Sequence, residues 1–256
     1  MNIGDRMKSY EKLLELKVFS FQDACKVFGN NHTAKNTLKN LLDKEYIEKV
    51  KHNLYVVCDV EHKSTIADQY MIGSKITEDA CISYHSALEF YGVKNQIFYT
   101  VYVSTNKKFE EFEFEGFTYA QVKQKHNFGI QKIRNVVVTD KERTILDCIN
   151  NSGLAGGNEE LILCFELLNG IDEAKILEYL KKYNSKKLYA KAGFILEMFK
   201  ERWSINEETL KECKKHIGST RYYFDDETKR YPHKGVKEWN LIVPELFLNR
   251  GGTLYW

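Results

Sequence analysis

One helix-sized stretch carries side chains that could read DNA. From about Thr33 to Lys44 the apolar residues recur every three or four positions, which predicts an amphipathic helix. The opposite face carries Thr, Asn and Lys, whereas an ordinary solvated helix mixes Glu with Lys. Asn can bond an adenine edge through two hydrogen bonds, and Lys can reach a guanine edge or a phosphate. We therefore predict contact with double-stranded DNA through Thr33, Lys35, Asn36, Lys39 and Asn40.

The segments around this stretch predict a winged helix-turn-helix. A helix from Phe21 to Phe28 has one apolar face, and Ser20 precedes it as a suitable N-cap. Two β-rich runs follow, Ile47 to Val50 and Leu54 to Val57, and Asn53 between them suits the positive φ angle of a hairpin turn. In this motif the second helix docks in the major groove. The predicted wing contacts are Lys49, Lys51, His52 and Asn53.

The length and the pattern predict two domains. A chain of 256 residues can hold one large or two ordinary domains, and the winged module uses only the first quarter. A helix from Ile3 to Leu16 should complete its three-helix core, and a helix from Ser64 to about Lys75 should link it to the rest. We expect a DNA-binding domain over residues 1–60, an α+β domain over residues 61–256, and separable roles for the two.

Composition narrows the class of protein. Apolar residues at 43% and charged residues at 29% are typical of a soluble globular chain, and two prolines argue against long disordered linkers. The formal charge of +2 is too small for a protein that coats nucleic acid non-specifically, because such binding neutralises many phosphates. Any DNA binding should therefore be local and directed to a site.

Cysteine spacing and hydropathy predict the environment. The six cysteines lie far apart, with no C-x-x-C pair and no nearby His at metal-ligand spacing, so we expect buried reduced thiols and no metal. The chain begins without a charged and then apolar leader, and it has no apolar run of about 18 residues. We expect a cytoplasmic protein that does not enter the membrane.

The second domain should combine a sheet with helices. Alternating residues predict a small antiparallel sheet over about 98–138, whose last strand, Val136 to Val138, leads into a capping box at Thr139-Asp-Lys-Glu142. Helices should occupy about 139–200, followed by an aromatic, β-prone tail over 221–256. The three later helices are expected at Glu159 to Leu168, Asp172 to Lys182 and Leu188 to Phe199.

Three segments suggest chemistry but do not match its requirements. His85 and Ser86 are adjacent helical residues that point in different directions, and no orienting acid or glycine elbow accompanies them. The glycine-rich break at 153–157 follows a helix and lacks the Lys-Ser or Lys-Thr of a phosphate-binding loop. Gly73-Ser74 lacks the downstream aspartate pair with which a nucleotidyltransferase holds Mg²⁺. We assign no catalytic residue and no cofactor.

Several segments in order resemble the AbiEi-type antitoxins, which are transcriptional regulators of abortive-infection, type IV toxin-antitoxin systems in bacteria. The similarity spans most of the chain. It lies in Leu54-Tyr55-Val56, Ile82-Ser-Tyr-His-Ser-Ala-Leu-Glu-Phe-Tyr-Gly92, Val138-Thr-Asp-Lys-Glu-Arg-Thr-Ile-Leu-Asp147, Ala192-Gly-Phe-Ile-Leu-Glu197 and Trp239-Asn-Leu-Ile-Val243.

The resemblance implies a protein that represses its own promoter through the winged domain and opposes a nucleotidyltransferase-like toxin encoded beside it. Family members often have a basic residue followed by glycine before the Leu-Tyr pair, where this chain has His52-Asn53. The resemblance brings no catalytic residues to the second domain, so it does not imply an enzyme.

Two other functions fit the sequence. The winged module could bind a protein partner without specific DNA binding, and binding that ignores salt and operator sequence would favour that interpretation. A nuclease or nucleotidyltransferase would instead require Asp and Glu side chains that converge in a pocket of the folded chain.

Overall fold

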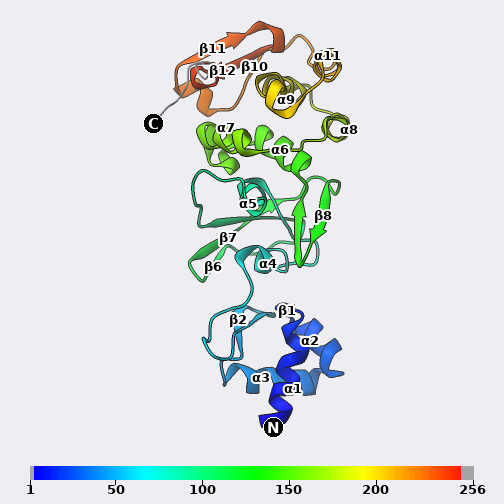
Figure 1. Ribbon diagram of the computed structural model, residues 1–256, viewed down its shortest axis with the longest axis vertical. Helices are drawn as coiled ribbons and strands as arrows, with labels where there is room; N and C mark the ends of the chain where they lie inside the picture. The colour runs from blue at the N-terminus through cyan, green and yellow to red at the C-terminus, as the bar shows by residue number, and fades with distance from the viewer. Residues whose placement is uncertain (1–2, 249–256) are drawn as a thin grey trace. The chain divides into compact units, whose positions relative to one another are not determined.

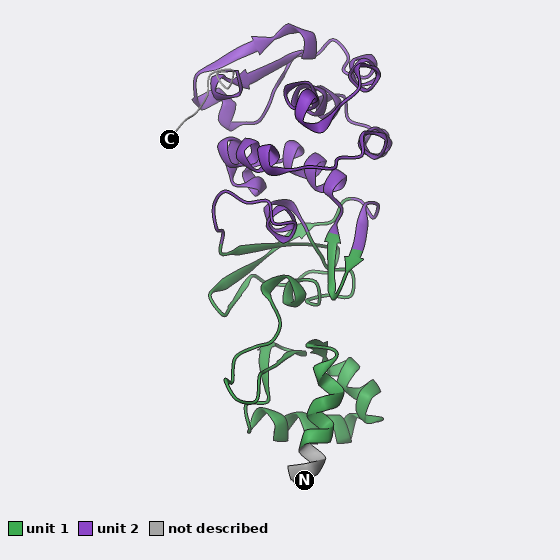
Figure 2. Ribbon diagram, in the orientation of Figure 1, with its two compact units in different colours: residues 1–82, 99–125, 132–138 green, residues 83–98, 126–131, 139–256 purple. Residues whose placement is uncertain are grey.

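The computed structural model describes the backbone of residues 3–248 and the side chains of residues 7–248. The chain divides into two compact units, coloured green and purple in Figure 2. Unit 1 comprises residues 1–82, 99–125 and 132–138, and unit 2 comprises residues 83–98, 126–131 and 139–256. This division differs from the expected boundary near residue 60, which stays a prediction about which parts fold and act independently.

Unit 1 begins with three helices and a small sheet (Figure 1). Ser20 caps the second helix in a capping box, because its hydroxyl accepts from the Asp23 amide while the Asp23 carboxylate accepts from the Ser20 amide. The predicted positive φ of Asn53 is confirmed at 62°. The sheet has the strand order β1-β3-β2, and both pairings are antiparallel. The elements are α1 Ile3–Leu14, β1 Val18–Ser20, α2 Phe21–Phe28, α3 Asn31–Leu42, β2 Ile47–Lys51 and β3 Leu54–Val57.

These helices and strands share one apolar core. Leu13 of α1, Phe19 of β1 and Leu41 of α3 are fully buried in it. The Tyr10 hydroxyl donates to the carbonyl oxygen of Cys58 at 2.8 Å, so the first helix is also held by a polar contact. The core fixes which face of α3 is turned away from the protein.

Unit 1 also contains most of a six-stranded mixed sheet, in the order β6-β7-β5-β4-β9-β8. β5 pairs with β7 in parallel, and β4 pairs with β9 in parallel, whereas the β4–β5 and β6–β7 pairs are antiparallel. The expected all-antiparallel sheet is therefore wrong, because β6 lies between β5 and β7 in sequence but on the outer edge of β7 in space. The elements are α4 Gln69–Gly73, β4 Cys81–Ile82, β5 Thr100–Thr105, β6 Phe112–Phe114, β7 Phe117–Lys123, β8 Ile130–Ile133 and β9 Val136–Thr139.

Unit 2 is mainly helical, and the three later helices predicted from the sequence are present with ends shifted by a few residues. Gly92, which follows the first of the helices, has a left-handed conformation with φ 76°. The elements are α5 Tyr84–Phe90, α6 Lys141–Asn150, η1 Ser152–Ala155, α7 Gly157–Leu167, α8 Glu173–Tyr183, α9 Lys186–Met198, α10 Lys200–Trp203 and α11 Glu207–Lys215.

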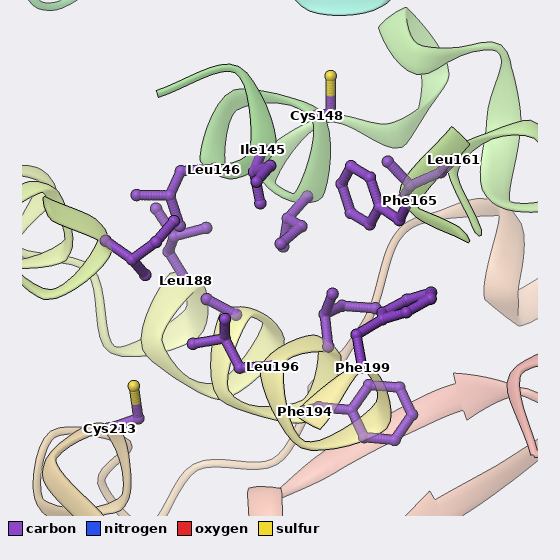
Figure 3. Close-up of a cluster of buried hydrophobic side chains, with 14 of the residues drawn as sticks. Ile145, Leu146, Cys148, Leu161, Phe165, Leu188, Phe194, Leu196, Phe199 and Cys213 are labelled. Atoms are coloured by element: carbon purple, nitrogen blue, oxygen red, sulfur yellow. The ribbon is translucent and has the colours of Figure 1, made fainter. Parts of the chain in front are cut away.

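The core of unit 2 lies between these helices. In Figure 3, Ile145 and Leu146 of α6 face Leu188 and Leu196 of α9, and Phe165 of α7 lies beside them. All five side chains are buried. Each Å² of apolar surface removed from water stabilises the folded state by about 25 cal/mol, so this cluster is the main stabilising contribution of the unit.

The aromatic tail forms a short three-stranded sheet in unit 2, with β12 between a parallel β10 and an antiparallel β11. Trp239 is fully buried, and its indole Nε1 donates to Glu197 of α9 at 2.6 Å. The last predicted β-prone residues, 249–256, lie outside the described part. The elements are β10 Tyr222–Tyr223, η2 Glu227–Arg230, β11 His233–Val236, η3 Lys237–Trp239, β12 Leu241–Pro244 and η4 Glu245–Phe247.

Two predicted helix caps are wrong. Ser64 does not start a helix, because its neighbour Thr65 pairs with Cys58, and α4 begins instead after Asp68, whose carboxylate accepts from the Met71 amide at 2.8 Å. Thr139 is still part of β9, and Asp140 caps α6 by accepting from the Arg143 amide at 2.9 Å. In both places a strand pairing continues one or more residues further than the sequence pattern suggests.

The fold is therefore α+β, with helices and several sheets. All six cysteines are free thiols, five of them buried and Cys25 half-buried. Within residues 3–248, no helix is both long enough and apolar enough to span a membrane.

Candidate nucleic-acid interface

Helix α3 presents a polar face because its other face is held in the core. Its first turn is capped by Asn30, whose side-chain oxygen accepts from the Thr33 amide at 2.8 Å. The helix therefore begins two residues earlier than the sequence pattern indicates. The buried residues recur at the three-and-four spacing of one helical face, and they are Ala34, Thr37, Leu38 and Leu41.

The structure brings five of the predicted DNA-binding residues together on the exposed face of α3. The Asn40 amide donates to the carbonyl oxygen of Asn36 at 2.9 Å, and the Asn36 amide lies 3.0 Å from Nε2 of His32. His32 is not among the predicted residues, although its position one turn before Asn36 on the same face is a readable signal. The exposed residues of this face include Thr33, Lys35, Asn36, Lys39 and Asn40.

The charge on this face has one sign. The sequence of α3, Asn-His-Thr-Ala-Lys-Asn-Thr-Leu-Lys-Asn-Leu-Leu, has two lysines and no acidic residue. Lys35 and Lys39 are four residues apart, so their ammonium groups project from the same side of the helix. Neither lysine is neutralised by an acid of its own helix, which leaves both charges for an anionic partner.

The four predicted DNA-binding residues of the hairpin differ in exposure. Lys49 on β2 and the turn residues His52 and Asn53 are exposed. Lys51 is half-buried, and its ammonium lies 5.0 Å and 4.5 Å from the ring centroids of Phe109 and Phe112, in the same unit. Burial lowers the pKa of Lys51. Because its ammonium lies against these rings, Lys51 contributes less positive charge to the surface of the hairpin than its position in the sequence suggests.

A second polar cluster, which the sequence pattern does not reveal, is buried in unit 2. His85 of α5 has Nε2 3.2 Å from Oε1 of Glu160, and the Cys164 thiol donates to the same oxygen at 3.3 Å. All three side chains are buried. The expectation that no acid accompanies His85 is wrong, because Glu89, four residues later on α5, has Oε2 3.8 Å from Nδ1, and Glu160, 75 residues further along the chain, lies beside Nε2.

The position of His85 is fixed by its surroundings. The Phe98 ring packs on the imidazole with centroids 4.0 Å apart. Tyr84, directly before His85, has a φ of 54°, a conformation uncommon for a bulky residue. Unusual backbone conformations persist only where the surrounding structure determines them.

Comparison with known proteins identifies the fold and no family. No family model matches the sequence, and no curated protein matches it. Among solved structures, the chain is similar to the RV2827C protein from Mycobacterium tuberculosis, with a TM-score of 0.60 at 10% sequence identity. The similarity covers 91% of this chain and 89% of that one. At this identity it shows a shared fold alone.

Proposed function

We propose that the protein is a DNA-binding autorepressor and the antitoxin of a type IV toxin-antitoxin system, opposing a nucleotidyltransferase-like toxin. In this proposal the N-terminal helices and hairpin act as a winged helix-turn-helix, with α3 as the recognition helix in the major groove of the protein's own promoter. The exposed, acid-free face of α3 is the observation that carries the DNA-binding part.

The chemistry of that face supports the assignment. Asn36 and Asn40 have the side chain that bonds an adenine edge through two hydrogen bonds, and Lys35 and Lys39 can reach guanine edges or phosphates. Helix α3 is held in place because four of its side chains are buried against the other N-terminal helices and strands. A rigid helix is better suited to base readout than a mobile loop, since its side chains keep one register along the groove.

The antitoxin part of the proposal comes from the ordered sequence similarity to AbiEi-type antitoxins. Two of the similar segments pack inside unit 2, where α5 contains His85 and α6 contains Arg143 and Asp147. Both segments supply buried residues, so their roles in the proposal are to hold unit 2 together. A partner toxin would recognise the surface that they support.

We expect Asn36→Ala and Lys39→Ala to weaken promoter binding in different ways. If Asn36 pairs with a base, its loss should cost about 1 to 3 kcal/mol and relax the sequence preference. If Lys39 contacts a phosphate, its loss should weaken binding to all sequences alike and lower the salt slope by about 1. Gel-shift titrations of the promoter and a scrambled duplex at several salt concentrations measure both effects.

Lys12→Ala is a matched control for these titrations, because Lys12 is an exposed lysine in the last turn of α1. It should leave affinity and salt slope nearly unchanged. Binding that survives both α3 substitutions, or that ignores salt and operator sequence, would favour the protein-interaction module and remove α3 from the DNA.

We also expect promoter repression and toxin neutralisation to separate when the N-terminal module, residues 1–66, is removed. The cut belongs before Ala67, because Thr65 pairs with Cys58 and the Ile66 amide donates to the Val57 carbonyl, so residues 65–66 lose partners with the module. The chain from residue 67 onward retains the six-stranded sheet and unit 2, so it should melt cooperatively. It should protect cells that express the neighbouring toxin while losing promoter binding.

The full-length Asn36→Ala, Lys39→Ala double variant is the control for that truncation, since it keeps the module and removes its proposed DNA contacts. It should protect as well as the wild type. A truncated chain that folds by circular dichroism yet fails to protect, beside a double variant that protects, would place the neutralising surface on the N-terminal module.

A further inference from the structure

The carboxylate of Glu160 is the centre of the buried cluster in unit 2. Its Oε1 is approached by four donors: the His85 imidazole at 3.2 Å, the Cys164 thiol at 3.3 Å, and the Asn95 and Gln96 amides at 3.1 Å each. A carboxylate oxygen has two lone pairs, so four donors exceed what it can accept with good geometry. One cation in place of the two side-chain protons would relieve this crowding.

Two of the three distances between the ligand-type atoms are close to those of a metal site. A tetrahedral zinc ion with Zn–N and Zn–O bonds near 2.0 Å and a Zn–S bond near 2.3 Å holds its ligand atoms roughly 3.3 to 3.6 Å apart. The Nε2–Oε1 and Sγ–Oε1 distances are 3.2 Å and 3.3 Å, and all three atoms lie within 4.8 Å of one another. Glu160 and Cys164 are four residues apart on α7, so they project from one face of that helix.

A second carboxylate lies where a metal-binding histidine usually has one. Nδ1 of His85 is buried and has no hydrogen-bond partner among residues 7–248. It lies 3.8 Å from Oε2 of Glu89. In metal sites the ligating histidine donates its other ring proton to a carboxylate, which fixes the tautomer and raises the basicity of the ligating nitrogen. A small adjustment of Glu89 would complete this arrangement.

We propose that His85 Nε2, Glu160 Oε1 and Cys164 Sγ bind a zinc ion, with Glu89 as the carboxylate partner of His85. Thiolate, imidazole and carboxylate together suit zinc, whereas magnesium and calcium prefer oxygen ligands alone. Three protein ligands leave the fourth position to a water molecule. Binding forms the Zn–S bond and breaks the S–H bond of Cys164, and the proton is released to solvent while the His85 proton resides on Nδ1.

The start of α7 is shaped around this cluster. Gly156 has a φ of 84°, and a Cβ atom there would lie 2.7 Å from the Phe98 ring and 2.9 Å from Cγ of Glu160. The absence of a side chain at Gly156 therefore lets Phe98 and Glu160 close on His85. The glycine-rich break that resembles a phosphate loop in sequence serves, in the fold, as the close-packed wall of the zinc site.

Cobalt substitution tests the site directly. Because the three ligands are buried, the full-length protein should be produced in medium supplemented with zinc or cobalt and then freed of loose metal by gel filtration. We expect about one metal ion per chain by elemental mass spectrometry, and a thiolate-to-cobalt absorption band with the visible bands of tetrahedral cobalt. At free zinc about 100 times Kd, the folded-to-unfolded ratio should rise about 100-fold, which a shifted thermal melt reports.

Variants assign the ligands. Cys164→Ser should remove the thiolate-to-cobalt band, and Glu89→Gln should keep the band while lowering metal affinity by roughly 10-fold to 100-fold. Cys213→Ser and Cys25→Ser are matched controls, because Cys213 is equally buried in the same unit and Cys25 is the most exposed thiol. Both should keep the wild-type spectrum.

Two results would overturn the zinc site. The first is a folded wild-type protein that carries no zinc or cobalt after growth in supplemented medium, in which case the cluster is a hydrogen-bonded core alone. The second is a thiolate-to-cobalt band that disappears in Cys25→Ser or Cys213→Ser. If Cys164→Ser does not fold, the wild-type stoichiometry and the two cysteine controls still decide between these outcomes.

Discussion

Replacing Arg143 by Met should destabilise unit 2 by about 3 to 5 kcal/mol, the cost of breaking a buried ion pair from one side. Arg143 is buried on α6, and its Nε donates to Asp147 Oδ2 at 2.7 Å. Its Nη1 donates to the Phe128 carbonyl at 2.9 Å, and its guanidinium lies 4.9 Å from the Phe128 ring centroid. One side chain therefore ties residues 126–131 to α6.

Most of this loss of stability arises because the buried carboxylate of Asp147 loses its charged partner. Burial raises the pKa of Asp147, although Arg143 acts in the opposite direction, and the Tyr183 hydroxyl also donates to its carboxylate. Without Arg143 the carboxylate would be held in a dry environment by Tyr183, so it would take up a proton more readily. The loss of stability should therefore grow as the pH rises from the ordinary Asp pKa of about 3.9 to the raised pKa of Asp147 in the variant, and it should stay constant above that pH, where both states are deprotonated.

Chemical denaturation followed by circular dichroism measures the effect, and a double variant supplies the control. Arg143→Met combined with Asp147→Leu removes both charges, and replacing a buried pair by apolar residues is often close to neutral. The double variant should thus recover most of the stability lost by Arg143→Met. A single variant that loses less than about 1 kcal/mol would show that water reaches this pair.

The N-terminal module can be predicted from sequence because its signals are local. The capping pair Ser20 and Asp23 is three residues apart, and the positive φ of Asn53 belongs to a two-residue turn. The apolar spacing of α3 by itself determines which face of that helix is exposed. Local side-chain spacing governs each of these features, so a single sequence is enough to predict them.

The sheet and the buried clusters depend on distant residues. The parallel pairing of β5 with β7 cannot be deduced from the alternation of apolar and polar residues along a strand. Side chains alternate between the two faces of the sheet whichever strand lies alongside and whichever way it runs. The local sequence does not reveal the partner of His85 Nε2, because Glu160 lies in another helix, 75 residues away. The segment with Arg143 and Asp147 has the pattern of a helix start with a capping box, whereas in the fold its charged residues form a buried ion pair one turn apart.

Wild-type stability should rise by about 2 kcal/mol between pH 7 and pH 9 relative to Lys191→Met. Lys191 is 1% exposed on α9, and its ammonium donates to the carbonyl oxygens of Ile149 and Asn150 at 2.6 Å and 3.1 Å. Burial, with a smaller contribution from Lys187, lowers the pKa of Lys191 to about 7. The unfolded chain keeps the ordinary lysine pKa of about 10.4.

The direction follows from the protons that each state binds. Between pH 7 and about 10 the unfolded chain holds the Lys191 proton and the folded chain has largely lost it, so raising the pH favours folding. Below pH 7 both states are protonated, and the full penalty for burying the charge is present. Buried thiols act in the opposite direction, because burial raises the pKa of Cys58 to about 11 and that of Cys213 to about 12.

For that reason the wild-type curve alone does not isolate Lys191, whereas its difference from Lys191→Met does. Urea midpoints of both proteins at pH 7, 8 and 9 should diverge steadily, since the two chains share every cysteine and tyrosine. Lys181→Met, which removes an exposed lysine from α8, should follow the wild-type curve at each pH. If the wild-type and Lys191→Met curves ran parallel over this range, Lys191 would keep its proton inside the fold. The carbonyls at the end of α6 would then stabilise the ammonium enough to offset its loss of water.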